Sequence, residues 1–147
     1  MFLNTDFLTD GEIKLQLEKT VDAIPEKEWL PAYHFAICDM NGQIMGKCDF
    51  RIGHSHKTYY GGNIGYTISE KFRGHRYAVK ACRLLFELAK KHNLGYVMIT
   101  CNPQNYASRK TCEILGGELL EIAKLPADSD MRVLGEDMMC IFRFELG

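Results

Sequence analysis

Alternating apolar and polar residues predict β structure in the first half of the chain. Residues 33–38 alternate up to the turn sequence Asp39-Met40-Asn41-Gly42, and residues 43–51 follow as a second extended segment. An Asn-Gly pair between two such segments is typical of a β-hairpin, because both residues tolerate the backbone conformations of a tight turn. The pattern therefore predicts an antiparallel hairpin over 33–51. A further strand is predicted over 59–68, where apolar residues recur at every second position.

The second half of the chain predicts alternating helices and strands. Apolar residues recur at intervals of three and four from 77 to 92, which indicates a helix with one buried stripe. The nearly continuous apolar run 95–101 is typical of a central strand, which a right-handed crossover would lay parallel to the strand before the helix. A helix over 108–115 and strands over 118–124 and 139–144 follow. Residues 7–24, with imperfect apolar spacing, are predicted as a helical segment or a pair of turns.

Length and composition bound the class of protein. The 147 residues show no repeat or linker, so one domain over 1–147 is expected. The net charge of −1 gives no basic excess, so no nucleic-acid partner is expected. No apolar run approaches the roughly 20 residues that cross a bilayer, and the N-terminus lacks a signal-peptide pattern. We therefore expect a cytoplasmic protein with no membrane partner.

Cysteine and histidine spacing argues against a disulfide framework and a metal site. The six cysteines form no C-x-x-C pair and fall mostly in apolar segments, so free and mostly buried thiols are expected. His54 and His56 alternate, but no third and fourth ligand follows at suitable spacing. A polar loop is the favoured interpretation, and no metal is expected.

The junction between the strand over 59–68 and the helix over 77–92 is the strongest candidate for a binding site. A helix start presents N–H groups without intrahelical partners, and the helix dipole adds partial positive charge, so this end attracts phosphate. Gly74 and Ala78 are small enough to let a ligand approach the main chain, and Arg73 adds a cation. The alternative is a solvated, basic helix start without a ligand.

The order of elements resembles the acetyl-coenzyme A core of the GNAT superfamily of N-acetyltransferases over about residues 33–120. After the basic turn, the helix and the apolar strand comes the segment Asn102-Pro103-Gln104-Asn105-Tyr106-Ala107-Ser108. The resemblance implies an α/β (α+β) fold with a mixed central sheet, antiparallel N-terminal strands, a splayed parallel pair and flanking helices. It also implies acetyl-coenzyme A as co-substrate.

The resemblance assigns cofactor contacts to individual residues. The pyrophosphate turn of the family, Q/R-x-x-G-x-G/A, matches at Arg73 and Ala78, but Arg76 replaces the middle Gly. The Arg76 side chain would either crowd the diphosphate or add a charge-assisted contact, and we favour the contact. On the preceding strand, the main chain of Tyr66 and Ile68 would pair with the pantetheine arm. The complete predicted cofactor-binding set is Tyr66, Ile68, Arg73, Gly74, His75, Arg76, Tyr77, Ala78, Asn102, Asn105 and Ser108.

Ile68 and Ser108 are the predicted catalytic residues. The Ile68 N–H would polarise the thioester carbonyl, and Ser108 matches a serine that returns a proton to the thiolate in the ribosomal-protein-type branch. Other branches use a tyrosine where this chain has Cys112, which is the weaker candidate for the acid. Asn105 matches the asparagine that holds the pantetheine amide, and Asn102 is expected to shape the same turn. Alternatively, Ile68 is plain core, Ser108 is a first-turn helix residue, and both asparagines are helix caps.

The general base is not identified by sequence. Many family members carry a glutamate on the strand before the turn, but residues 59–69 of this chain contain no carboxylate. Glu70 comes directly after them and is expected to face solvent. A relayed water, His34, His54 and Asp49 remain candidates.

Substrate contacts are expected from the variable parts of the chain. These are the first helical segment, the loop from His54 to Tyr60, and the C-terminal strands near Arg132 and Phe142. The aromatic candidates for an acceptor pocket are Tyr33, Tyr59 and Tyr60.

The resemblance predicts an N-acetyltransferase that moves the acetyl group directly to a primary amine, either of a small molecule or of a protein N-terminus. Direct transfer is preferred to a cysteine intermediate because no cysteine is paired with a motif histidine. A second copy of the same chain, in a homodimer, is a candidate partner. The alternative function is a coenzyme A-binding regulatory or interaction module with weak or no turnover, which the missing strand carboxylate and Arg76 favour slightly.

Overall fold

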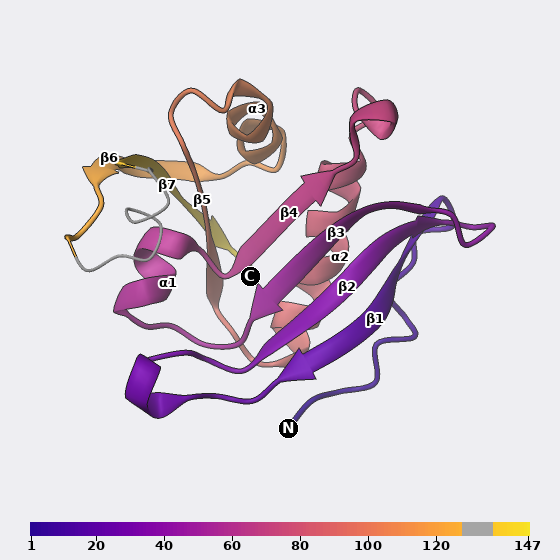
Figure 1. Cartoon of the computed structure of the whole chain (residues 1–147), viewed down its shortest axis with the longest axis horizontal. Coiled ribbons are helices and arrows are strands. Elements are labelled where there is room, and N and C mark those ends of the chain that lie inside the picture. Colours follow the sequence, from indigo (N-terminus) through magenta and orange to yellow (C-terminus); the bar gives the residue numbers. More distant parts are fainter. Residues whose placement is uncertain (128–136) are drawn as a thin grey trace.

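Over the residues that the structure describes, the fold consists of two antiparallel sheets with three helices. The computed structural model describes residues 1–127 and 137–147. One sheet has the order β1-β2-β3-β4 and the other β5-β7-β6 (Figure 1). In chain order the elements are β1 (Ile13–Val21), η1 (Pro25–Lys27), β2 (Ala32–Asp39), β3 (Ile44–Arg51), α1 (His56–Gly61), β4 (Ile64–Ile68), η2 (Glu70–Phe72), α2 (Tyr77–Lys91), β5 (Tyr96–Cys101), α3 (Tyr106–Ile114), β6 (Glu118–Lys124) and β7 (Met138–Glu145), where η marks a short 3-10 turn.

The two sheets meet where β4 begins. Asn63 N donates to Met98 O at 2.7 Å, and Met98 N donates to Asn63 Oδ1 at 2.9 Å. No ladder among the strands that the structure describes joins β4 to β5. Figure 1 shows the two strands running in the same general direction and diverging toward the ends that lead to α2 and α3. The predicted α/β class and splayed strands are therefore confirmed, and the central sheet is divided at this point.

Helix α2 covers one face of the four-stranded sheet, behind it in Figure 1. Its apolar stripe includes Cys82, Leu85 and Leu88, which are fully buried against Phe35 and Phe50 of β2 and β3. Burying one such aliphatic or aromatic side chain contributes about 1.5–3 kcal/mol, so the helix is held by its stripe rather than by propensity. The opposite face of the sheet is free of α2 and carries the polar residues of β1 to β3.

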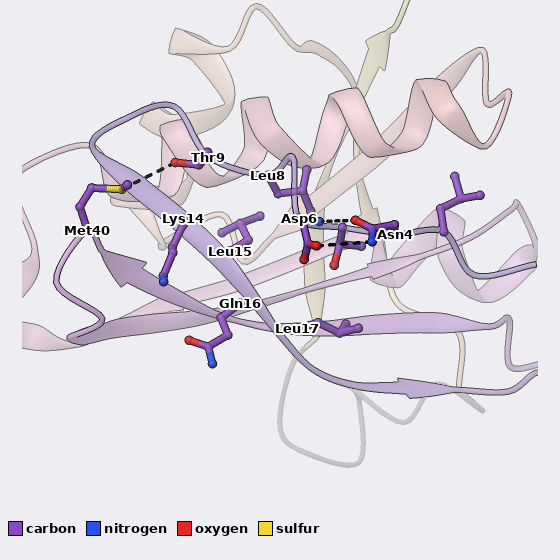
Figure 2. A pocket seen from close by; sticks show the side chains of 11 residues that line it. Asn4, Asp6, Leu8, Thr9, Lys14, Leu15, Gln16, Leu17 and Met40 are labelled. Carbon is purple, nitrogen blue, oxygen red and sulfur yellow. Dashed lines mark hydrogen bonds between the residues drawn. The ribbon is translucent and has the colours of Figure 1, made fainter.

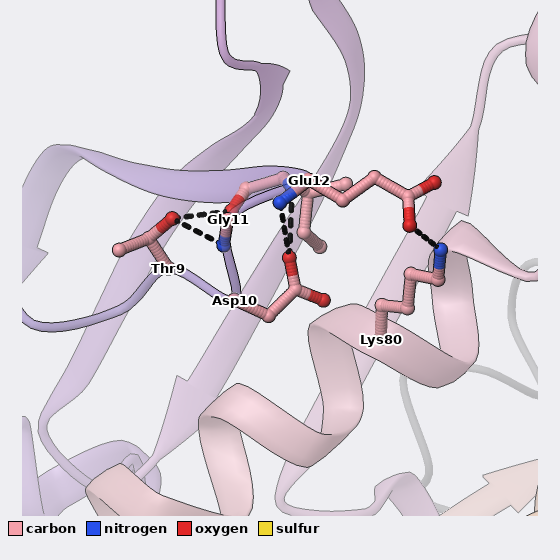
Figure 3. Close-up of polar contacts among 6 residues, drawn as sticks. Thr9, Asp10, Gly11, Glu12 and Lys80 are labelled. Carbon is pink, nitrogen blue, oxygen red and sulfur yellow. Dashed lines mark hydrogen bonds and ion pairs between the residues drawn. The ribbon is translucent and has the colours of Figure 1, made fainter.

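The helical segment predicted over 7–24 is wrong. Residues 13–21 form β1, which pairs with β2 and buries Ile13 and Leu15. Ile13 and Leu15 are two residues apart, the spacing of one face of a strand. Pairing with β2 supplies hydrogen-bond partners for the backbone of this segment, so the strand forms in place of a helix. The turn before β1 is fixed by Asp10, whose Oδ1 accepts from the amides of Glu12 and Ile13 at 2.8 Å each. Glu12 also forms an ion pair with Lys80, which ties this turn to α2 (Figure 3).

The strand predicted over 59–68 begins only at Ile64, because residues 56–61 form α1. Ser55 and Thr58 make a reciprocal cap: Thr58 N donates to Ser55 Oγ at 3.3 Å, and Ser55 N donates to Thr58 Oγ1 at 2.8 Å. Two N–H groups at the helix start are thereby satisfied. The alternating tyrosines and glycines obscured this helix start in the sequence.

Replacing Gly46 with Ala is expected to lower the free energy of unfolding by about 1–3 kcal/mol. A Cβ at this position of β3 would lie 2.3 Å from Thr67 O and 3.1 Å from Ile68 Cα, so β4 must shift. Urea unfolding followed by circular dichroism measures the effect. Gly95→Ala is the matched control, since a Cβ there meets nothing within 4 Å. A Gly46→Ala protein as stable as the control protein would contradict the close approach of these strands.

Candidate functional site

The gap between β4 and β5 has main-chain polar groups on its β4 wall. Ser69 N donates to Met45 O of β3 at 2.9 Å. Successive peptide groups of a strand point in opposite directions, so the amides of Tyr66 and Ile68 point away from β3 and toward β5. This is the orientation that pairing with an extended ligand requires. The predicted contacts of these two residues with pantetheine stay predictions.

A hydroxyl pair spans from β4 to α3. The Tyr66 hydroxyl lies 2.6 Å from Ser108 Oγ. Burial raises the pKa of Tyr66 far above its usual value, so its phenol stays protonated at neutral pH and can donate to Ser108. Ser108 also lies within hydrogen-bond reach of Cys101, a thiol whose pKa burial raises to about 11. The sequence predicted Ser108 as the acid but assigned no role to the Tyr66 side chain, since the two residues are 42 positions apart.

The turn between β4 and α2 explains why the family has glycine where this chain has Arg76. Gly74 has φ +89° and Arg76 has φ +63°. The second value lies in the left-handed region, which costs a non-glycine residue roughly 1–2 kcal/mol. Arg76 is the N-cap residue of α2 and makes no side-chain cap. A guanidinium carries donors only, so Arg76 cannot cap the first-turn N–H groups of the helix.

Arg73 links the turn to the end of β4. Its Nε donates to Ile68 O at 2.9 Å. The guanidinium is therefore held at the open end of the gap, beside the start of α2. The neighbouring rings of His75 and Tyr77 lie 5.6 Å apart between centroids. The phosphate contacts assigned to Arg73, Gly74, His75, Arg76, Tyr77 and Ala78 stay predictions.

The asparagines shape the turn before α3. Asn105 Oδ1 accepts from Ser108 N at 3.1 Å and so caps the helix, while Asn102 Oδ1 accepts from Gln104 N at 2.8 Å. Asn105 is thus the helix cap and Asn102 a residue of the preceding turn, and the predicted pantetheine contacts of both asparagines stay predictions. Cys112 is fully buried, and burial raises the pKa of its thiol well above the usual value.

A row of residues crosses the outer face of the four-stranded sheet, opposite α2. In register, Lys19 of β1 lies opposite His34 of β2, His34 opposite Asp49 of β3, and Asp49 opposite Gly65 of β4. Directly opposed residues share a face. A Cβ at Gly65 would lie 3.1 Å and 3.3 Å from the Asp49 oxygens, so this carboxylate lies over the backbone of β4. Arg51 Nη1 lies 3.2 Å from Asp49 Oδ1.

Of the base candidates, Asp49 is the one that reaches β4. The strand has no carboxylate of its own, but the absence of a side chain at Gly65 leaves room for a carboxylate from β3. His34 is the next residue in the row. His54 lies elsewhere, stacked on Tyr96 at 4.0 Å between ring centroids, and burial lowers its pKa. Glu70 is exposed, as expected.

A cavity of about 660 Å³ lies over this row. Its lining includes Lys19, His34, Arg51 and Gly65 from the sheet, together with residues of α1 and of the segment after η1. Of the aromatic candidates, Tyr60 lines the cavity. A pocket role for Tyr33 is wrong, because its ring is fully buried.

The other predicted substrate contacts do not meet at this cavity. Tyr59 donates to Glu121 of β6, and Phe142 is buried in the core. Arg132 lies outside the described residues.

A second cavity, of about 510 Å³, lies between the N-terminal segment and β1 (Figure 2). Lys14, Gln16 and Met40 are among its lining residues, and Thr9 Oγ1 donates to Met40 Sδ at 3.6 Å. It shares no lining residue with the larger cavity and lies at the sheet edge farthest from β4. We therefore leave it outside the candidate site.

Residues 1–127 and 137–147 offer neither a metal cluster nor a membrane-spanning helix. Within these ranges no group of three or more His, Cys, Asp or Glu residues is placed to hold a metal ion. None of the helices there has the length and apolar character that crossing a membrane requires.

The family follows from a comparison of the sequence with known domains. The profile of the acetyltransferase (GNAT) domain matches residues 5–118. This chain belongs to the GNAT acetyltransferase family. It thus carries an acyltransferase domain of the GNAT type. A comparison with curated proteins finds no match to the sequence.

Solved acetyltransferase structures share the fold at low sequence identity. The ribosomal-protein-S5-alanine acetyltransferase from Vibrio fischeri is 21% identical with a TM-score of 0.60, over 78% of this chain and 61% of that one. The microcin C7 self-immunity acetyltransferase MccE, solved with acetyl-CoA and AMP, is 23% identical with a TM-score of 0.59, over 78% and 61%. The ribosomal L7/L12 alpha-N-protein acetyltransferase RimL, solved with coenzyme A, is 15% identical with a TM-score of 0.67, over 94% and 96%. The chain spans less than two thirds of the length of the first two.

Proposed function

We propose that this GNAT domain transfers the acetyl group of acetyl-coenzyme A directly to a primary amine. The gap between β4 and β5 is the observation that carries the proposal, because three features meet there. The Tyr66 and Ile68 amides point into the gap, the hydroxyl pair of Tyr66 and Ser108 lies beside it, and the start of α2 lies at its open end. The MccE and RimL structures, with acetyl-CoA and coenzyme A, support the choice of ligand.

The residues of the gap fit the chemistry of acetyl-coenzyme A. Its pantetheine arm is an extended chain of amides, which suits the main-chain groups of β4, and its diphosphate suits the first-turn amides of α2 and the guanidinium of Arg73. The bound co-substrate supplies an activated acetyl thioester. The Ile68 amide is the donor that we assign to the thioester carbonyl oxygen, where negative charge develops.

Asp49 is the group that we assign to take the proton of the acceptor amine. An alkyl amine with a pKa near 10.4 costs about 4.6 kcal/mol to deprotonate at pH 7, so a base at the site has a large effect. The carboxylate lies over Gly65 on the face of β4 opposite α2. The acceptor and acetyl-coenzyme A thus approach β4 from different sides.

Ser108 is the group that we assign to donate a proton to the departing thiolate. The Tyr66 phenol, kept protonated by its raised pKa, can donate to Ser108 Oγ, and the serine hydrogen would then turn from Cys101 to the sulfur of the coenzyme. We also place this reaction in the cytoplasm, where six free cysteines stay reduced.

Gly74→Val is expected to weaken binding of acetyl-coenzyme A at least about tenfold, a loss of about 1.4 kcal/mol. The substitution forces a β-branched residue into φ +89° at the turn and adds bulk where the diphosphate approaches. Isothermal titration calorimetry measures the dissociation constant. Gly42→Val, at φ +87° in the β2–β3 turn, is the control with the same backbone strain.

The result separates the proposed function from its alternative. Wild-type protein that does not bind acetyl-coenzyme A would refute the transferase. Tight binding without transfer to any amine would favour the coenzyme A-binding module. Arg76→Gly in the same titration shows whether the arginine adds a phosphate contact, in which case the loss of its charge weakens binding despite the relieved backbone.

A further inference from the structure

The larger cavity carries an excess of positive charge. Its charged lining residues are Lys19, Arg51, Lys57 and Glu28, with His34 and His56 beside them. Arg51 forms an ion pair with Asp49 through Oδ1 alone, at 3.2 Å. Among the residues that the structure describes, no carboxylate forms an ion pair with Lys19 or Lys57. Two ammonium groups therefore face a cavity with one acidic lining residue.

Negative and positive groups lie at opposite ends of the row that floors this cavity. Gly65 lines the cavity at the β4 end, where the Asp49 carboxylate lies against its backbone, and Lys19 lines it on β1 at the other end. Neighbouring strands lie about 4.8 Å apart, so Lys19 and Asp49 are separated by about 10 Å across the sheet. A ligand with its amine at Asp49 would place its distal end beside Lys19.

The walls between these ends suit a hydrocarbon segment. Val21, Trp29, Leu30 and Ala32 line the cavity together with Tyr60 of α1. A volume of about 660 Å³ lies within the range of small-molecule sites, which are mostly apolar with a few placed polar groups. The cavity thus has apolar walls beside a floor that runs from Lys19 through His34 to Gly65, with the Asp49 carboxylate at the Gly65 end.

From this arrangement we infer that the acceptor is a small primary amine with a carboxylate or phosphate at its far end. The inference rests on the proposed function, since it names the acceptor of that reaction. Asp49 receives the amine, the apolar walls hold the connecting chain, and Lys19 binds the acidic group. A protein N-terminus, the other acceptor class, presents no acidic group at a fixed distance from its amine.

Three amines of equal chain length test the inference: ε-aminocaproate, hexylamine and hexamethylenediamine. Their far ends are anionic, neutral and cationic. The expected order of kcat/KM is ε-aminocaproate, then hexylamine, then the diamine, with about a tenfold difference between the first two, as one charge-assisted contact contributes. Aminohexyl phosphate tells whether phosphate replaces carboxylate. The preference should shrink as salt is raised, because the lysines are partly exposed.

Reversing the charge at position 19 tests whether Lys19 causes the preference for the anionic amine. Lys19→Glu is expected to invert the order, so that hexamethylenediamine becomes a better acceptor than ε-aminocaproate. Lys91→Glu makes the same change of charge at the end of α2, on the other side of the sheet, and should leave the order unchanged. Unchanged order in Lys19→Glu would overturn the inference, as would faster acetylation of a short peptide N-terminus than of ε-aminocaproate.

Calorimetric titration with the acetylated forms of ε-aminocaproate and hexylamine separates this inference from the proposed function. Acetyl transfer to all three amines at equal rates would overturn the inference and leave the transferase intact. Preferred binding of the anionic ligand without any acetyl transfer would refute the transferase and retain the charged site. Equal binding of both ligands, with no transfer, would overturn both.

Discussion

Asp49→Asn is expected to lower kcat/KM for acetylation of an alkyl amine by about 10²–10⁴-fold, the usual contribution of a positioned general base. The amide keeps the shape of the side chain over Gly65 but cannot take a proton at neutral pH. Steady-state release of coenzyme A, measured at fixed acetyl-coenzyme A and varied amine, gives the value. Circular dichroism and cofactor titration establish that the fold and the cofactor site are retained.

The choice of amine distinguishes a base from a merely structural aspartate. An α-amino group, with a pKa of about 7.7–8.0, is already partly deprotonated at pH 7 and depends less on a base. The loss caused by Asp49→Asn should therefore be smaller for an α-amino acceptor than for an alkyl amine. Asp22→Asn removes an exposed carboxylate beyond β1 and serves as the control. An equal loss for both amines would exclude Asp49 as the base.

Ser108→Ala is expected to lower kcat about 10²-fold, since a thiolate must then depart without a positioned acid. Tyr66→Phe should lower kcat about tenfold, because the serine loses the donor that orients it. The double variant should be no slower than Ser108→Ala, because the tyrosine acts through the serine and the two effects are not additive. Tyr106→Phe, which removes a hydroxyl from an exposed ring on α3, is the control.

Changing the thiol of the acetyl donor distinguishes an acid catalyst from a residue with only a structural role, because only loss of the acid makes the rate depend on that thiol. An acetyl donor whose thiol is more acidic departs without protonation, so Ser108→Ala and Tyr66→Phe should approach wild-type rates with such a donor. Urea unfolding tells how much stability each variant loses, which for one hydrogen bond is about 0.5–1.5 kcal/mol. Additive losses in the double variant, or losses independent of the donor, would contradict the assigned pair.

The parts of the fold that the sequence predicts well are those decided by local periodicity. Helix α2 and strands β5 to β7 follow their apolar patterns to within a few residues. The errors fall where local signals compete. Residues 13–21 have a spacing compatible with a weak helix, and pairing with β2 makes them a strand. The cap formed by Ser55 and Thr58 places a helix inside an apparently alternating run.

The candidate site also has parts that local sequence patterns predict and parts that they do not. Motif spacing finds the turn before α2 and Ser108, because each is a local feature of a family pattern. Register and packing between distant strands create the remaining contacts. Asp49 reaches β4 only because β3 and β4 pair at Gly65, and Tyr66 meets Ser108 only because α3 folds back over the gap. Such contacts have no signature in one sequence.

The seam at Asn63 has a consequence for the order of events in the proposed reaction. Its main chain and side chain join the two sheets at Met98, and its Nδ2 donates to Arg51 O at 3.0 Å and to Gly53 O at 2.6 Å. Past Asn63, where β4 and β5 diverge, the pantetheine arm would lie between these two strands and join the two sheets. Acetyl-coenzyme A would then act as a structural element of the enzyme before it acts as a reactant, and β4, whose Gly65 lines the acceptor cavity, would be joined to β5 beyond Asn63 only after the co-substrate has bound. Such an enzyme takes up its two substrates in a compulsory sequence, with the amine second.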